Sequence, residues 1–178
     1  MFLKEGLTAT EDLIKEPGVY LMENTLLYGD PLAASDIPDE EITIPIGTAE
    51  IKKEGKDVSL IAHGRCVIVA LEAAKKLEGE RGINAEVVDL RSIRPLDEET
   101  ILKSVAKTNR VVLVDESKPF CGISSQIATM IQEKAFDDLD APIKRVTSVD
   151  APAIYSPPVE KEQIPNVSRI VDMVQSLG

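Results

Sequence analysis

The chain has 178 residues, 43% of them hydrophobic and 29% charged, which is enough to bury one core without disulfides or metal ions. Its net charge is −11 with no cluster of lysine or arginine, which argues against nucleic acid as a partner. Cys66 and Cys121 form no CxxC pair, and no apolar stretch approaches the roughly 20 residues of a membrane span. We therefore expect a soluble domain without a disulfide framework, zinc site or membrane span.

The first 56 residues show the least regular pattern. Residues 18–24 read as a strand, residues 25–47 as a long connection with an acidic run, and residues 48–58 as a hairpin into the first parallel strand. The first 13 residues match neither a signal peptide nor a transit peptide, so we expect a protein that is not secreted.

From residue 57 onward, strand and helix patterns alternate. The predicted strands are residues 57–62, 84–90, 110–117 and 142–150, and the predicted helices are residues 65–80, 97–109 and 122–139, with a last helix starting near Asn166. Residues 151–165 form a proline-rich connection. Strands separated by helical crossovers predict an α/β three-layer sandwich with a mostly parallel sheet of about five strands.

Ligands of open parallel sheets bind beyond the carboxyl ends of the strands, so the loops at those ends are the places to search. His63, the only histidine, follows a strand and could be an acid, a base or a hydrogen-bonded turn residue. Asp115 and Glu116 are adjacent and should point to opposite faces of a strand, which argues against a paired acid and base. No glycine-rich phosphate motif occurs. We assign no catalytic, cofactor-binding or metal-binding residue.

Two arginines occupy another of these loops. Arg91 and Arg94 lie in the stretch DLRSIRPLDEET, residues 89–100, directly after a predicted strand. A guanidinium binds carboxylates through two parallel hydrogen bonds, so the pair suits an acidic surface or an anionic ligand. Ion pairs with acidic neighbours are an equally good explanation, because the chain has 31 acidic residues.

The same stretch resembles a known family. Together with YLMENTLLYG (20–29), IPIGTAEI (44–51) and RVTSVDAPAIYS (145–156), it is similar to the C-terminal half of the beta subunit of thiamin-diphosphate-dependent 2-oxo acid dehydrogenases, nearest the pyruvate enzyme. The resemblance implies a transketolase C-terminal-like domain at residues 48–178, preceded by an extended linker and the remnant of another domain at residues 1–47. In that family the catalytic and cofactor-activating residues of the subunit lie in the N-terminal domain, so this chain alone should not be catalytic.

The resemblance also implies partners and a role. The assembled enzyme uses thiamin diphosphate and magnesium, neither of which we expect this chain to bind alone. Expected partners are the alpha and beta subunits of an alpha2-beta2 heterotetramer and the dihydrolipoyl acyltransferase, whose basic binding domain would dock at Asp140 and Gly178. We expect Arg91, Arg94 and His63 at a subunit interface. The implied compartment is the cytoplasm in bacteria, and the mitochondrial matrix or plastid in eukaryotes.

Other interpretations stay open at this point. The chain could be a free-standing α/β module that binds an anion or a protein through Arg91, Arg94 and His63. It could also be a fragment of a branched-chain 2-oxo acid dehydrogenase, a transketolase or a deoxyxylulose phosphate synthase, and an acetoin substrate is not distinguished from pyruvate.

Overall fold

The computed structural model describes residues 20–31 and 43–177. Its elements are, in chain order, η1 (Thr25–Gly29), β1 (Glu50–Lys53), β2 (Val58–Ala62), α2 (Arg65–Arg81), β3 (Ala85–Asp89), α3 (Glu98–Thr108), β4 (Val111–Asp115), α4 (Ile123–Lys134), η2 (Phe136–Asp138), β5 (Lys144–Thr147), α5 (Pro157–Gln163) and α6 (Val167–Gln175). Among these helices none is both long and apolar enough to cross a membrane.

The strands form one five-stranded sheet in the order β1-β3-β2-β4-β5. The four strands from β2 to β5 are parallel to one another, and β1 is an antiparallel edge strand beside β3. Every residue of β2, β3 and β4 is buried, because helices cover both faces of a parallel sheet. The predicted α/β fold with a mostly parallel sheet is confirmed.

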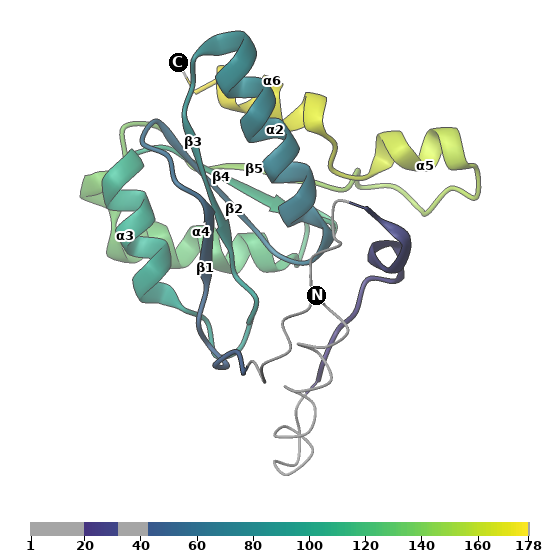
Figure 1. Ribbon diagram of the computed structural model, residues 1–178, viewed down its shortest axis with the longest axis horizontal. Helices are drawn as coiled ribbons and strands as arrows, with labels where there is room; N and C mark the ends of the chain where they lie inside the picture. The colour runs from purple at the N-terminus through teal and green to yellow at the C-terminus, as the bar shows by residue number, and fades with distance from the viewer. Residues whose placement is uncertain (1–19, 32–42, 178) are drawn as a thin grey trace.

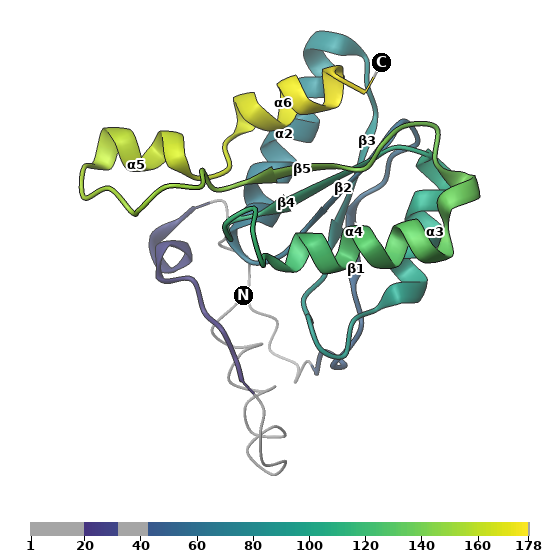
Figure 2. The ribbon, with the colours of Figure 1, turned by 180° about the vertical axis from the view of Figure 1, so that it is seen from behind.

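Two hydrophobic clusters fill the space between the layers. On β2, Leu60 packs with α2 and α6, while its neighbour Ile61 packs with α3 and α4. This alternation follows from the pleat, which points successive side chains to opposite faces of the sheet. Figures 1 and 2 show α2 and α6 on one side of the sheet and α3 and α4 on the other. The molecule is therefore a three-layer sandwich.

Two predicted elements near the start of the chain are wrong. Residues 20–24 are not a strand and lead into the 3-10 helix η1, while residues 18 and 19 lie outside the described part. The expected hairpin into the first parallel strand does not form either, because β1 pairs with β3 rather than with β2. The parallel β2 takes β3 and β4 as its two neighbours, so no edge of β2 is left for β1.

Two further differences lie toward the end of the chain. The helix predicted for residues 122–139 ends at Lys134 and is followed by the short 3-10 helix η2. The proline-rich connection contains α5, which projects away from the sheet (Figure 1). The buried side chain of Gln163 closes this excursion, since it accepts a hydrogen bond from Ile154 N and donates one to Pro152 O, both at 3.1 Å.

Candidate functional site

The carboxyl ends of β2 and β4 bring His63 and Asp115 together. The two strands are parallel neighbours, so the residue after β2 and the last residue of β4 lie at the same edge of the sheet. His63 Nε2 is 3.5 Å from Asp115 Oδ1, and this buried nitrogen has no hydrogen-bond acceptor among the described residues. At this separation the contact is longer than a good hydrogen bond, and it is an ion pair only when the imidazole is protonated.

Asp115 is held from several sides. Its carboxylate accepts hydrogen bonds from Ser117 N at 2.9 Å, Ser124 N at 3.1 Å and the Ser117 hydroxyl. Burial alone would raise the pKa of Asp115, but His63, Ser117 and the Ser124 amide together hold it well below its usual value. Because Asp115 accepts a hydrogen bond from Ser124 N, this amide at the start of α4 is not available to an outside anion.

Gly122 is required for this arrangement. A Cβ atom at this position would lie 2.2 Å from Ser117 Oγ and 2.6 Å from Lys118 O. The close approach of the chain in this turn therefore explains why the position is a glycine.

Glu116 turns away from Asp115 and has different partners. Its carboxylate accepts hydrogen bonds from Arg65 NH1 at 2.9 Å and from Asn24 Nδ2 at 3.1 Å. Asn24 also caps η1, and Leu27 is the buried residue of η1, so these contacts attach η1 to the carboxyl edge of the sheet. The adjacent carboxylates are thus separated, as predicted, and form no paired acid and base.

Arg91 and Arg94 behave differently from each other. Arg91 forms an ion pair with Glu50 of the edge strand β1. Arg94 is exposed and makes no ion pair or side-chain hydrogen bond within residues 20–31 and 43–177. Since His63 pairs with Asp115, these three predicted site residues do not converge on one ligand. The anion-binding module loses support, because the charge of Arg91 is already neutralised.

The loop that carries these arginines has a second function that sequence reasoning missed. It anchors the segment before β1: Gly47 N donates to Ser92 Oγ, and Ala49 N donates to Asp97 Oδ2, both at 2.9 Å. Asp97 is at the same time the N-cap of α3, because its side chain accepts a hydrogen bond from Thr100 N at 3.0 Å. These hydrogen bonds join the IPIG segment to the DLRSIRPLD segment. The presence of both segments in the sequence is the one signal that could have indicated this contact.

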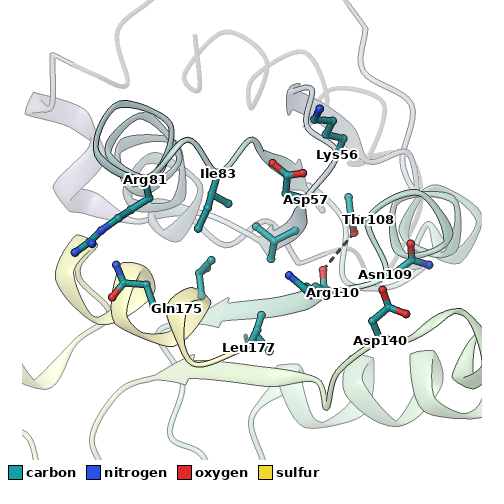
Figure 3. Close-up of a pocket in the computed structure, with 12 residues that line it drawn as sticks. Lys56, Asp57, Arg81, Ile83, Thr108, Asn109, Arg110, Asp140, Gln175 and Leu177 are labelled. Atoms are coloured by element: carbon teal, nitrogen blue, oxygen red, sulfur yellow. Dashed lines mark hydrogen bonds between the residues drawn. The ribbon is translucent and has the colours of Figure 1, made fainter.

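A cavity of about 610 Å³ lies at the amino ends of the parallel strands, opposite to the ends that carry His63 and Asp115. It lies between the ends of α2, α3 and α6 and the residues that lead into β2 and β4 (Figure 3). Asp140 and Leu177, the last described residue of the chain, both line this cavity. Gly178, the other predicted docking residue, lies outside the described residues.

The chain is similar to a known domain family and to several known proteins. A family model described as transketolase, C-terminal domain, matches residues 47–170. The acetoin:2,6-dichlorophenolindophenol oxidoreductase subunit beta of Bacillus subtilis is 44% identical over 96% of this chain and 48% of that protein. The pyruvate dehydrogenase E1 component subunit beta-2, mitochondrial, of Oryza sativa is 45% identical over 89% of this chain and 42% of that protein. This chain thus spans less than half the length of these two curated relatives.

A solved structure gives the same result for the fold. A split-gene transketolase, described as an inactive beta4 tetramer, matches with a TM-score of 0.69 and 31% sequence identity. The match covers 80% of this chain and 46% of that one. Together with the family model, which covers most of the chain, these findings establish that the chain belongs to the transketolase C-terminal domain family.

Proposed function

We propose that this chain forms the C-terminal domain of the beta subunit of a thiamin-diphosphate-dependent 2-oxo acid dehydrogenase that converts pyruvate to acetyl-CoA. The support is the identity of 40–45% with pyruvate dehydrogenase beta subunits from plants, a nematode, yeast and Rhizobium meliloti. The domain boundary near residue 48 and the location in the cytoplasm, mitochondrion or plastid belong to the same proposal.

Within that enzyme the domain would serve assembly and docking rather than chemistry. The observation that carries this proposal is the cavity that Asp140 and Leu177 share, because the predicted acyltransferase site needs Asp140 and the chain end to be neighbours. A carboxylate is an acceptor-only group that a basic partner can pair with. The net charge of −11 would favour the encounter with such a partner.

The described residues offer no side-chain cluster for the metal ion of this enzyme class. They contain no group of three or more histidine, cysteine, aspartate or glutamate side chains that could hold a metal ion. We therefore assign no residue of this chain to thiamin diphosphate or magnesium and derive no step through them. In our proposal the cofactor belongs to the assembled enzyme, with its alpha and beta subunits.

Acetoin is a second candidate substrate. The relative from Bacillus subtilis that is named as an acetoin oxidoreductase subunit aligns with 96% of this chain at 44% identity, which is as similar as the pyruvate dehydrogenase subunits. The choice between the two substrates does not change the docking proposal. Docking concerns residues on the surface of this chain, whichever substrate the enzyme uses.

Docking can be tested by surface plasmon resonance against the basic subunit-binding domain of the dihydrolipoyl acyltransferase. We expect Asp140→Ala to weaken binding by about 1 kcal/mol if the pair lies on the rim of the interface, and by about 2–5 kcal/mol if it is desolvated. Deletion of Gly178 should have a smaller effect, since a chain end frays easily. Both losses should shrink at higher salt.

A matched control removes an equal charge elsewhere. Glu72 is an exposed residue in the middle of α2 and does not line the cavity. Glu72→Ala should leave the affinity close to that of the unchanged protein. An affinity that is insensitive to Asp140→Ala, or one that falls equally in both variants, would remove Asp140 from the docking site.

A further inference from the structure

Large apolar side chains are exposed on three segments at the carboxyl edge of the sheet. Tyr20 and Met22 precede η1, Phe120 lies in the loop between β4 and α4, and Tyr155 lies just before α5. Each of these four residues is at least 81% exposed. Figures 1 and 2 show the purple segment that contains η1 and the helix α5 beyond the same end of the sheet. The exposed side chains therefore belong to one end of the molecule.

Hydrogen bonds attach these three segments to one another. Glu116, the first residue after β4, accepts from Asn24 Nδ2 at 3.1 Å through its carboxylate and from Ser148 Oγ at 2.6 Å through its backbone oxygen. In the same loop, Lys118 Nζ donates to Val149 O at 2.8 Å. The η1 segment, the β4–α4 loop and the residues that lead to α5 are thus fixed relative to one another.

The excursion that contains α5 buries very little of its own surface. Residues 152–155 and 157–162 are all exposed, and within this described stretch Gln163 is the one residue of α5 that is buried. Helices shorter than about 12–15 residues are marginal in water unless an apolar face is packed. The helix α5 has seven residues, and its Val159 is exposed, as are Ile154 and Tyr155 before it. Its apolar side chains therefore need a cover.

The exposed apolar area has the size of a protein interface. An aromatic side chain buries on the order of 150–250 Å², so Tyr20, Phe120 and Tyr155 together offer roughly 450–750 Å². The largest apolar patch of a typical monomer is about 300–600 Å². Met22 and Ile154 add to the area here, which brings it close to the roughly 800 Å² that each partner contributes to a standard interface.

The polar groups at this edge are already engaged within the chain. The carboxylates of Asp115 and Glu116 both accept hydrogen bonds from other residues, and Lys118 donates to backbone oxygens. A small charged ligand would find few free partners here. The edge instead suits the apolar surface of a folded protein domain.

The course of the chain indicates which domain that is. The family model begins at residue 47, so residues 20–31 lie before the matched domain, and yet Asn24 attaches them to its carboxyl edge. Polypeptide that precedes the domain therefore runs along this edge. More than half of the length of each of the two curated relatives has no counterpart in this chain.

We propose that the carboxyl-edge surface is the docking surface for the other part of the beta subunit, the part of the curated relatives that this chain does not match. The surface is defined by Tyr20, Met22, Leu26, Phe120, Ile154 and Tyr155. This inference rests on the proposed function, since it takes the chain to be one domain of such a subunit. Because hydrogen bonds already fix the three segments, little conformational freedom is lost on docking.

The test joins this chain to the part that it lacks. The part of the Bacillus subtilis subunit beta outside its match is fused to the N-terminus of the full chain, and labelling of each cysteine by iodoacetamide is followed by mass spectrometry. Cys121 is exposed beside Phe120 and reports on the surface. Cys66 reports on unfolding, because burial raises the pKa of its thiol to about 12. We expect Cys121 to react on the order of tenfold more slowly in the fused protein than in the chain alone, with Cys66 unlabelled in both.

Two variants of exposed aromatic residues make the result decisive. Tyr155→Ser changes the carboxyl-edge surface, and Phe136→Ser changes a residue of η2 that is 64% exposed and lies outside it. Neither should shift the Tm of the chain alone, because neither side chain is buried there. In the fused protein, Tyr155→Ser should speed the labelling of Cys121 roughly threefold or more, while Phe136→Ser should leave it slow. Equal rates in the two variants, or an unprotected Cys121 in the fused protein, would overturn the proposal.

Co-expression keeps the test decisive if the fused protein does not fold. The same part, made as a separate polypeptide, should co-purify with the unchanged chain and with Phe136→Ser but not with Tyr155→Ser. Absence of co-purification with the unchanged chain would contradict the docking surface. Protection of Cys121 that appears in the chain alone as its concentration rises would identify a second copy as the occupant, and protection that requires the alpha subunit would identify that subunit; either result overturns the proposal.

Failure of this inference can be told apart from failure of the proposed function. The labelling needs neither substrate nor alpha subunit, whereas oxidation of pyruvate or acetoin by the fused protein with the alpha subunit tests the function. An active enzyme with a reactive Cys121 would remove the docking surface and keep the function. An inactive one with a protected Cys121 would keep the docking surface and count against the function.

Discussion

His63 of the β2–α2 loop faces Asp115 at the end of β4, with 3.5 Å between His63 Nε2 and Asp115 Oδ1. The contact joins the carboxyl ends of two central strands at the edge where such folds bind ligands. Here the edge is closed instead, because Asp115 also accepts hydrogen bonds from Ser117 and Ser124 and lies over the start of α4. We therefore expect Asp115 to act on stability.

The first prediction concerns the pH dependence of unfolding. The pKa of Asp115 lies below its ordinary value of 3.8 in the folded protein, so the ionised carboxylate stabilises the fold above that pH. This contribution is lost as the pH falls below about 4 toward the folded pKa. Asp115→Asn should lower the free energy of unfolding at pH 7 by about 1–3 kcal/mol.

Urea unfolding at pH 7, 4 and 2.5 measures this effect. The difference between the unchanged protein and Asp115→Asn should be constant from pH 7 to 4 and smaller at pH 2.5. Asp137→Asn, which changes an exposed residue of η2, serves as the control. A difference that persists unchanged at pH 2.5 would show that Asp115 acts through its shape and not through its charge.

The second prediction uses two glycines in different surroundings. Gly122→Ala would place a methyl group 2.2 Å from Ser117 Oγ, so we expect a loss of about 1–3 kcal/mol or more. Gly79 lies inside α2 with nothing within 4 Å of an added Cβ, so Gly79→Ala should stabilise the protein by about 0.5–1 kcal/mol. Thermal unfolding of both variants should shift in opposite directions, and a shift in the same direction would contradict the packing at Gly122.

The parts of the fold that the sequence predicts correctly are those whose signals are local. The helices α2 and α3 are examples, because the side-chain pattern that specifies each of them is set by neighbours within one or two turns. The strand β1 is different, because EIKK contains no information about its partner and the choice of β3 over β2 depends on which strand has a free edge. Similarly, α5 forms where two prolines suggested only a connection, since proline is well accommodated in the first turn of a helix.

The same distinction holds for the candidate sites. The ends of parallel strands can be located from the sequence, which is why His63 and Arg91 were singled out. The ion pair of Arg91 with Glu50 could not be identified, because the two residues are 41 positions apart and meet only through the antiparallel edge strand. The cavity was missed for a related reason: its lining residues come from separate segments of the chain that meet only at the amino ends of the parallel strands.

The third prediction concerns Arg91 and Arg94, whose place at a subunit interface remains a proposal. The ion pair between Arg91 and Glu50 is partly exposed, with 23% and 38% of the two side chains accessible, and such pairs contribute under about 1 kcal/mol. Arg94 has no partner among the described residues, so its removal leaves no group unsatisfied there.

We therefore expect the double variant Arg91→Ala and Arg94→Ala to fold normally and yet to associate more weakly with the alpha and beta subunits of the enzyme. The reason is that an interfacial carboxylate deprived of its arginine stays buried and unpaired. Light scattering after size exclusion of the mixed subunits measures the association, and circular dichroism checks the fold. The control is the double variant Lys75→Ala and Lys76→Ala, which removes the same charge from the exposed face of α2. Unfolding of the arginine variant would show that the loop needs these side chains for its own structure, and unchanged assembly would show that they only face solvent.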